Sequence, residues 1–120
     1  MVSEPAVRVA WGIVLALSPR LVLRRCPRTP STPAGRMVVR ALGVRHVLQG
    51  ITTARDAVPP GWSAVPDALH AASMAGLALR SDRWRAAALG DCCVACAFAL
   101  ASLQAARRGR QRSAGRGPAG

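Results

Sequence analysis

Residues 84–106 read WRAAALGDCCVACAFALASLQAA. From residue 86 onward, Asp91 is the only ionisable group in this stretch other than its cysteines. A helix needs about 20 consecutive apolar residues to cross the hydrocarbon core of a bilayer, and this stretch provides them. We therefore expect residues 84–106 to form a membrane-spanning helix.

Three further segments have the apolar spacing of helices: residues 6–23, 37–54 and 62–79. The last is apolar apart from Asp67, His70 and a few hydroxyls. Residues 37–54 are a weaker candidate for a span, because they carry arginines. An arginine at the centre of a bilayer costs about 2.5–3.5 kcal/mol.

The first segment is interrupted by Ser18-Pro19-Arg20. Its apolar part, about 15 residues, covers only about 22 Å as a helix, against about 30 Å of hydrocarbon. We expect a tilted or kinked helix over residues 6–23. A loop follows over residues 24–36, where no helix is expected because of Pro27, Pro30 and Pro33.

These segments predict an all-α fold, a small transmembrane bundle of about four hydrophobic helices, multi-pass in the plasma membrane. The helical membrane domain would occupy residues 1–106, and the Arg/Gly-rich residues 107–120 are expected to be disordered. Arginines divide almost evenly between the two sides, eight against seven. The positive-inside rule therefore leaves the orientation open.

The chain has a formal net charge of +12, and all 17 of its Lys/Arg residues are arginine. It has no Lys, Asn or Tyr, which is typical of a high-GC genome that supplies Arg where other proteins use Lys. A nucleic-acid binder would interleave basic residues with aromatic or polar groups, whereas these arginines lie between or beyond apolar runs. We expect the lipid bilayer as a partner, with a membrane protein or a second copy of the chain, and no nucleic acid.

Tryptophan lies near the start of three apolar segments, at Trp11, Trp62 and Trp84. Indole rings prefer the interface between lipid and water. These three residues are therefore expected to be interfacial anchors.

Polar residues recur on one helical face in two neighbouring segments. His46 and Gln49 share a face of the second segment, and Asp67 and His70 share a face of the third. In an antiparallel pair, Gln49 lies level with Asp67 and His46 with His70. The sequence predicts an interhelical cluster of these four residues.

Two further features concern the helix over residues 37–54. Gly43 and Gly50 would allow the helix over residues 62–79 to approach it closely. Asp91 lies on the same side of the membrane as Arg40 and Arg45. An ion pair of Asp91 with either arginine would relieve two buried charges at once.

The polar cluster has three interpretations. It can fix helix packing alone, which is the favoured one, or it can relay protons or ions. His46 and His70 can also be imagined as haem ligands on facing helices. Gln49 and Asp67 crowd that position, and no cofactor is expected.

Cysteines lie close together as Cys92, Cys93 and Cys96, a pattern that invites comparison with zinc sites. On a helix these thiols point away from Asp91, and hence toward lipid or a neighbour if Asp91 faces the bundle. Together with Cys26 they are predicted to be reduced thiols that behave as small apolar groups. No metal is expected.

Three stretches resemble a known class of protein: RALGVRHVLQ at residues 40–49, DALHAASM at 67–74 and RAAALGD at 85–91. They are similar to small multi-pass membrane proteins of high-GC actinobacteria that are uncharacterised in function. The resemblance covers residues 6–105. It implies a location in the cell envelope and carries no activity or catalytic residue.

The sequence contains no Gly-rich phosphate loop, no Ser/His/Asp nucleophile arrangement and no paired catalytic carboxylates. Catalytic residues are therefore not predicted, and the sequence favours a protein that is not an enzyme without deciding the matter. The favoured hypothesis is a small structural or accessory membrane protein. The alternatives are a minimal proton- or ion-handling membrane protein and a peripheral basic helical protein that binds anionic lipid or nucleic acid.

Overall fold

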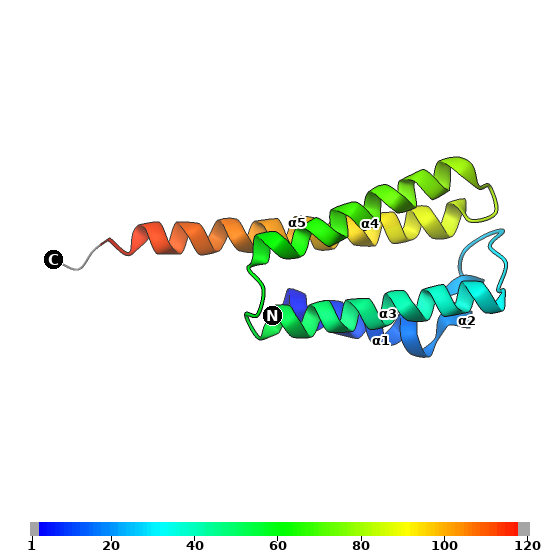
Figure 1. The fold of residues 1–120 in the computed structure, drawn as a ribbon, viewed down its shortest axis with the longest axis horizontal. Helices are drawn as coiled ribbons and strands as arrows, with labels where there is room; N and C mark the ends of the chain where they lie inside the picture. The colour runs from blue at the N-terminus through cyan, green and yellow to red at the C-terminus, as the bar shows by residue number, and fades with distance from the viewer. Residues whose placement is uncertain (1–2, 118–120) are drawn as a thin grey trace.

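The computed structural model describes residues 3–117, which contain helices and no strand. The all-α prediction is confirmed over this part of the chain. Figure 1 shows the helices in order: α1 (Glu4–Leu17), α2 (Pro19–Arg24), α3 (Pro33–Ala54), α4 (Pro60–Arg80) and α5 (Arg85–Gly115).

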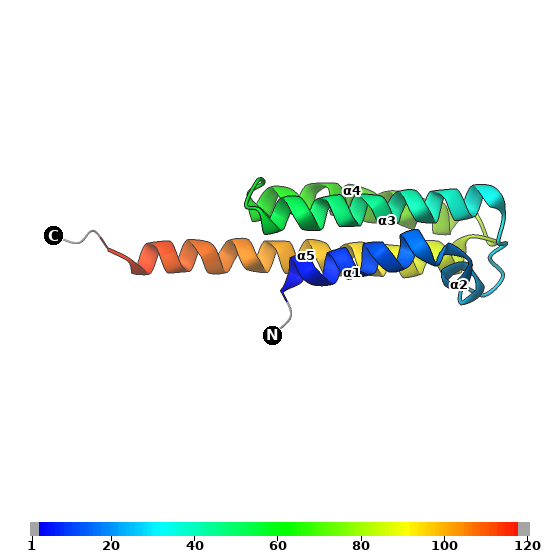
Figure 2. The same ribbon diagram turned by 90° about the horizontal axis from the view of Figure 1, so that it is seen from below.

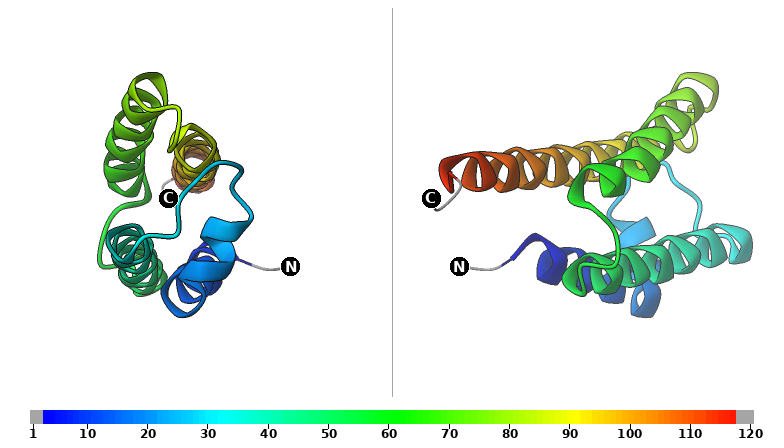
Figure 3. Two further views of the ribbon diagram at one scale, coloured as in Figure 1. Left: turned by 90° about the vertical axis from the view of Figure 1, so that its right-hand side faces the viewer. Right: turned by 60° about the vertical axis from the view of Figure 1, so that its left-hand side comes forward.

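The four long helices form two antiparallel pairs. α1 packs along α3, and α4 packs along α5, while the two pairs touch each other far less. Seen end-on, the α4–α5 pair lies on one side of the molecule and the α1–α3 pair on the other (Figure 3). Each neighbour runs in the opposite direction, so that the bundle is an up-and-down one (Figures 1 and 2). The molecule measures 64 × 28 × 22 Å.

Proline decides where the first helices begin and end. The expected kink in residues 6–23 is confirmed as a break at Ser18, after which Pro19 opens α2. The expected loop over residues 24–36 is too long, because Pro33 is the first residue of α3. A proline is tolerated there, since the first N–H groups of a helix have no intrahelical partner. The Thr32 side chain caps the same end by accepting a hydrogen bond from the Gly35 amide at 3.1 Å.

Glycine brings α1 and α3 into backbone contact. A Cβ added at Gly12 would lie 2.6 Å from the Gly43 carbonyl oxygen, and one at Gly50 would lie 2.5 Å from a methyl of Val9. The expectation that Gly43 and Gly50 face the helix over residues 62–79 is therefore wrong. The glycines serve the α1–α3 pair, because only a residue without Cβ allows backbones this close.

Small residues fill the interior of the bundle. The buried apolar set is dominated by alanine, and it comprises Leu15, Leu23, Ala64, Ala71, Ala78, Ala88, Ala95 and Phe98. Large apolar side chains lie instead on the outer surface of every long helix, with Leu79 the most exposed of them at 83%. The interior also holds fully buried Arg8, His46 and Asp67. The bundle is thus polar at its centre and apolar on its surface.

α5 continues well past the bundle. Disorder was expected from residue 107, but the structure has helix through Gly115. Residues 107–115 are exposed and contain mainly Arg, Gln, Ala and Gly. Arg, Gln and Ala are strong helix formers, so the helix extends here without support from tertiary packing.

Among the described residues, α5 is the one helix that is long and apolar enough to cross a membrane by length and composition. The other long helices fall short of that criterion. In α3 the reason is its polar residues, which include Arg40, Arg45, His46 and Gln49. The weakness of residues 37–54 as a span, expected from their sequence, is confirmed.

Candidate functional site

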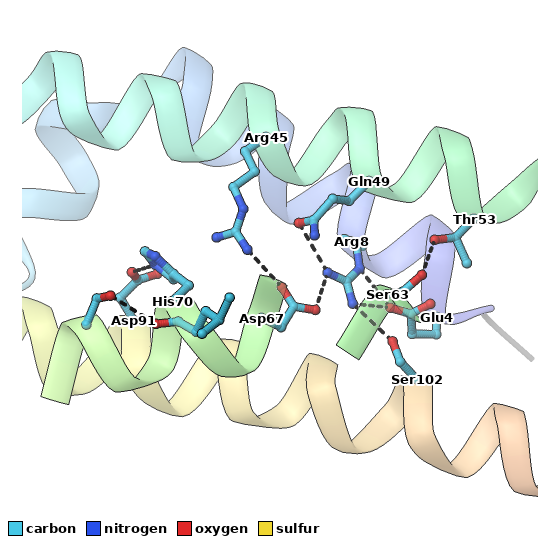
Figure 4. A network of polar contacts seen from close by, with 12 residues as sticks. Glu4, Arg8, Arg45, Gln49, Thr53, Ser63, Asp67, His70, Asp91 and Ser102 are labelled. Atoms are coloured by element: carbon cyan, nitrogen blue, oxygen red, sulfur yellow. Dashed lines mark hydrogen bonds and ion pairs between the residues drawn. The ribbon is translucent and has the colours of Figure 1, made fainter. Parts of the chain in front are cut away.

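Arg8 lies inside the bundle with no exposed surface. It belongs to α1, where the buried residues Arg8, Gly12 and Leu15 share one helical face at i, i+4 and i+7 spacing. Gly12 draws this face onto α3, and the arginine side chain extends from it into the space between the two helix pairs (Figure 4).

The guanidinium of Arg8 joins both helix pairs. Its Nη1 donates to Asp67 Oδ2 on α4 at 2.7 Å and to Gln49 Oε1 on α3 at 3.4 Å. Figure 4 shows Asp67 and Gln49 reaching Arg8 from different helices. Gln49 and Asp67, which the sequence places in one cluster, are thus connected through Arg8.

The remaining donors of Arg8 are also used. Nε donates to Glu4 Oε1 at 2.8 Å, and Nη2 donates to Ser102 Oγ on α5 at 3.4 Å. The guanidinium carbon lies 4.3 Å from the centre of the Phe98 ring, a cation–π arrangement. One side chain thus contacts all four long helices.

Charge is balanced around this arginine. Arg45 on α3 reaches the other carboxylate oxygen of Asp67 at 3.4 Å. Two arginines, Arg8 and Arg45, therefore face two carboxylates, Glu4 and Asp67. A buried charge without a partner would be strongly destabilising, and this arrangement avoids one. We call the set Glu4, Arg8, Arg45, Gln49, Asp67 and Ser102 the Arg8 centre.

His46 lies beside the Arg8 centre but makes no hydrogen bond within residues 3–117. Its ring is fully buried and lies 5.4 Å from the Phe98 ring, tilted by 43°. Neither ring nitrogen has a partner there. His46 therefore contributes to the centre through packing, whereas the cluster expected from the sequence had it among the polar contacts.

His70 and Asp91 form a second polar pair, separate from the Arg8 centre. His70 Nε2 lies 2.5 Å from Asp91 Oδ2. The expected ion pair of Asp91 with Arg40 or Arg45 is absent, because α4 and α5 form one hairpin that sets His70 directly opposite Asp91. Arg45 turns to Asp67 instead, and Arg40 is exposed.

Sequence reasoning missed Arg8, which is one of the seven arginines that it assigned to one side of the membrane. Two signals were present. Glu4 stands one helical turn before Arg8 and can neutralise it at i, i+4 spacing, and Gly12 stands one turn after it on the same face. An arginine between an acidic residue and a close-packing glycine is a candidate for burial.

The three tryptophans have different surroundings. Trp62 is 70% exposed, as an anchor at an interface would be. Trp84 lies against Gly35, where a Cβ would come within 2.7 Å of its ring. Trp11 is half-buried, and within residues 3–117 its indole nitrogen finds no partner. Trp11 and Trp84 line an apolar cavity of about 310 Å³ between the helix pairs, with Asp91 at its edge.

All four cysteines are free thiols. Cys93 and Cys96 are exposed on α5, while Cys92 donates to the Ala71 carbonyl oxygen at 3.4 Å. Cys26 lies after α2, donates to the Val22 carbonyl oxygen at 3.5 Å, and has its pKa raised by burial. No group of three His, Cys, Asp or Glu side chains suited to a metal ion occurs in the part of the chain that the structure describes.

No family model, curated protein or solved structure matches this chain. The resemblance to small actinobacterial membrane proteins therefore stays a prediction from the sequence.

Proposed function

We propose that this chain is a small integral membrane protein of structural or accessory role, in which α3, α4, α5 and the α1–α2 segment cross the bilayer and the Arg8 centre holds the two helix pairs together. The observation that carries the proposal is the distribution of polarity. Two arginines and two carboxylates gather inside the bundle, while large apolar side chains cover its outside. In a membrane, ionisable residues face the bundle interior and pair there.

The apolar surface extends over all four long helices. Leu17 on α1 is 77% exposed, Leu48 on α3 59%, Leu69 on α4 66% and Leu100 on α5 60%. Soluble monomers rarely expose contiguous apolar patches of more than a few hundred Å². Lipid is the solvent that suits such a surface, with a partner membrane protein or a second copy of the chain as its other natural neighbours.

A bundle of four spans is compatible with the modest hydropathy of α3 and α4. A hydropathy average counts every residue of a helix, including those that face its neighbours. Buried His46 and Asp67 lower the average without facing lipid. Arg40, which is exposed, lies in the first half of α3, and its long side chain can extend toward the interface.

The role of the Arg8 centre follows from the small number of other contacts between the two helix pairs. Contacts within each pair far exceed those between the pairs. Arg8 bridges them by hydrogen bonds to Asp67 and Ser102 on the far side. With its partners satisfied, such a network specifies one arrangement of the helices.

Alkaline carbonate extraction of cell membranes tests the location. The protein should stay in the membrane pellet, as an integral protein does, and require detergent for release. Release of the protein into the supernatant would contradict the proposal and favour a peripheral basic protein that binds anionic lipid or nucleic acid.

The second candidate function is proton handling, and the His70–Asp91 pair is what favours it. A histidine and a carboxylate at 2.5 Å on facing helices can share and pass a proton. Proteoliposomes that contain the protein would then dissipate an imposed pH gradient, and His70→Ala would abolish the flux. A proton flux no greater than that of empty liposomes would contradict proton handling, and the structural role would then be the one proposed function that stands.

A further inference from the structure

The end of α5 carries a run of unbalanced positive charge. Its apolar part, residues 86–106, is about 31 Å long as a helix, which matches the hydrocarbon core at about 30 Å. Beyond it, α5 continues alone past the start of α4 (Figures 1 and 2). This projection holds Arg107, Arg108, Arg110 and Arg112, and Arg116 follows it.

These arginines have no acidic residue near them along α5. The last carboxylate side chain in the sequence is Asp91, far inside the apolar part of α5. Within residues 3–117 none of the five arginines forms a salt bridge, whereas Arg85 at the other end of α5 pairs with Asp82. The projection therefore offers its charge to a partner outside the chain.

A groove of about 780 Å³ lies where α5 leaves α4. Trp62 and Val65 line it from α4, and Leu103, Ala106 and Arg110 line it from α5. Its apolar walls lie at the level where the apolar part of α5 ends, and Arg110 lies beyond them. Trp62, which is 70% exposed, stands at this level too.

The groove has the polarity of a phospholipid. Arg110 lies four residues beyond Ala106, or about 6 Å along the helix, within the headgroup layer that adds about 5–7 Å on each side of the hydrocarbon core. Its guanidinium can bind a phosphate by two parallel hydrogen bonds. Ser113 also lines the groove, but its hydroxyl already donates to the Gly109 carbonyl oxygen at 3.1 Å. Arg110 is thus the donor available to an anion.

We propose that this groove binds an anionic phospholipid, with the phosphate on Arg110, an acyl chain against Val65 and Leu103, and Trp62 beside the glycerol region. The proposal rests on the membrane location proposed above. It favours lipid over nucleic acid because the walls beside Arg110 are apolar. A nucleic-acid strand would instead call for several exposed aromatic rings along the basic track.

Tryptophan fluorescence provides the test. In a Trp11→Phe, Trp84→Phe background, Trp62 is the sole tryptophan. The protein is reconstituted in phosphatidylcholine vesicles that contain a minor fraction of lipid brominated in its acyl chains. Brominated phosphatidylglycerol should quench Trp62 more strongly than the same fraction of brominated phosphatidylcholine.

Arg110→Gln and Arg112→Gln form a matched pair, because they remove the same charge at nearly the same depth and only Arg110 lines the groove. Arg110→Gln should lower the preference for the anionic lipid at least about tenfold, because it removes the charge-assisted hydrogen bonds to the phosphate. Arg112→Gln should lower it much less. Circular dichroism checks that both variants keep their helix content.

Three results would overturn the proposal. The first is an equal loss of lipid preference in the two variants, and the second is equal quenching of Trp62 by the two brominated lipids. The third is an RNA oligonucleotide that restores Trp62 fluorescence at lower concentrations than a soluble anionic lipid does. The vesicles are washed with alkaline carbonate before each measurement. Protein lost in the wash counts against the membrane location. Protein that is retained but shows no lipid preference counts against this groove alone.

Discussion

Arg8 on α1 and Asp67 on α4 meet at 2.7 Å in a place where neither side chain is exposed. They come from different helix pairs and lie 59 residues apart in the sequence. Within residues 3–117 no other ion pair between the helix pairs is as short and as buried, although Arg45 supports it from α3 at 3.4 Å. The stability of the assembled bundle should therefore depend on this contact more than on any other single one.

Neutralising one partner should be costly. Arg8→Gln leaves the Asp67 carboxylate buried with only Arg45 nearby, and Asp67→Asn leaves Arg8 with Glu4 alone. Each variant should lose about 3–5 kcal/mol in free energy of unfolding. The measurement is reversible unfolding by SDS in mixed micelles, followed by circular dichroism.

The double variant Arg8→Gln, Asp67→Asn provides the control for that pair. It removes both charges, so it should be more stable than the sum of the two single losses implies, with a coupling of at least about 0.5 kcal/mol. Strictly additive losses would show that the two residues do not interact.

Glycine substitution should separate contact glycines from free ones. Gly12→Ala places a Cβ 2.6 Å from the Gly43 carbonyl oxygen, so that α1 and α3 must move apart, at a cost of about 1–3 kcal/mol. Gly76→Ala meets nothing within 4 Å and should stabilise α4 by up to about 1 kcal/mol. Thermal unfolding in detergent measures both. Similar losses at the two positions would contradict the close contact.

The partner of Asp91 can be identified by double-mutant cycles. Asp91→Asn combined with His70→Ala should show a coupling of about 0.5–3 kcal/mol in free energy of unfolding, because the two side chains are in contact. Asp91→Asn combined with Arg40→Gln should show none, since Arg40 is exposed and forms no ion pair within residues 3–117. The reverse outcome would restore the arginine pairing that the sequence alone predicts.

Thiol labelling should report which surface faces lipid. Cys93 is exposed on α5, yet in a bilayer it should react with a membrane-impermeant maleimide at least about tenfold more slowly than a cysteine placed at the exposed turn residue Asp82, because the reactive thiolate needs water. Single-cysteine variants in proteoliposomes provide the measurement. Equal rates would place both residues in water.

Much of the local structure was predictable from the sequence. Proline and apolar spacing act over a few residues, and so the break at Ser18 and the helical nature of all four long segments were expected correctly. The loop over residues 24–36 was predicted too long because of Pro33. A proline is excluded from the interior of a helix but is suited to its first turn. The extent of α5 misled too, since the propensity of Arg, Gln and Ala extends a helix that has no neighbour to hold it.

Two residues of the Arg8 centre, Gln49 and Asp67, belong to the cluster expected from the sequence, and in the structure both accept from Arg8. Helical rise and an antiparallel connection are the reasons for which they were expected to lie level. The partners of the other polar residues were not predictable in this way. From the sequence, Asp91 can pair with Arg40, Arg45 or His70. Only the packing of the α4–α5 hairpin selects His70.

The sequence by itself determined that this protein is helical, where its first helix breaks, and that polar residues must be accommodated among apolar ones. The tertiary structure decided which residues accommodate them. In the sequence, Arg8 is counted among the arginines on one side of the membrane. In the structure, Gly12 and Gly43 allow α1 to pack closely against α3, and Arg8 then points toward Asp67. The physical reason is that helix formation depends on neighbours along the chain, whereas a buried charge depends on an opposite charge that only packing can bring to it.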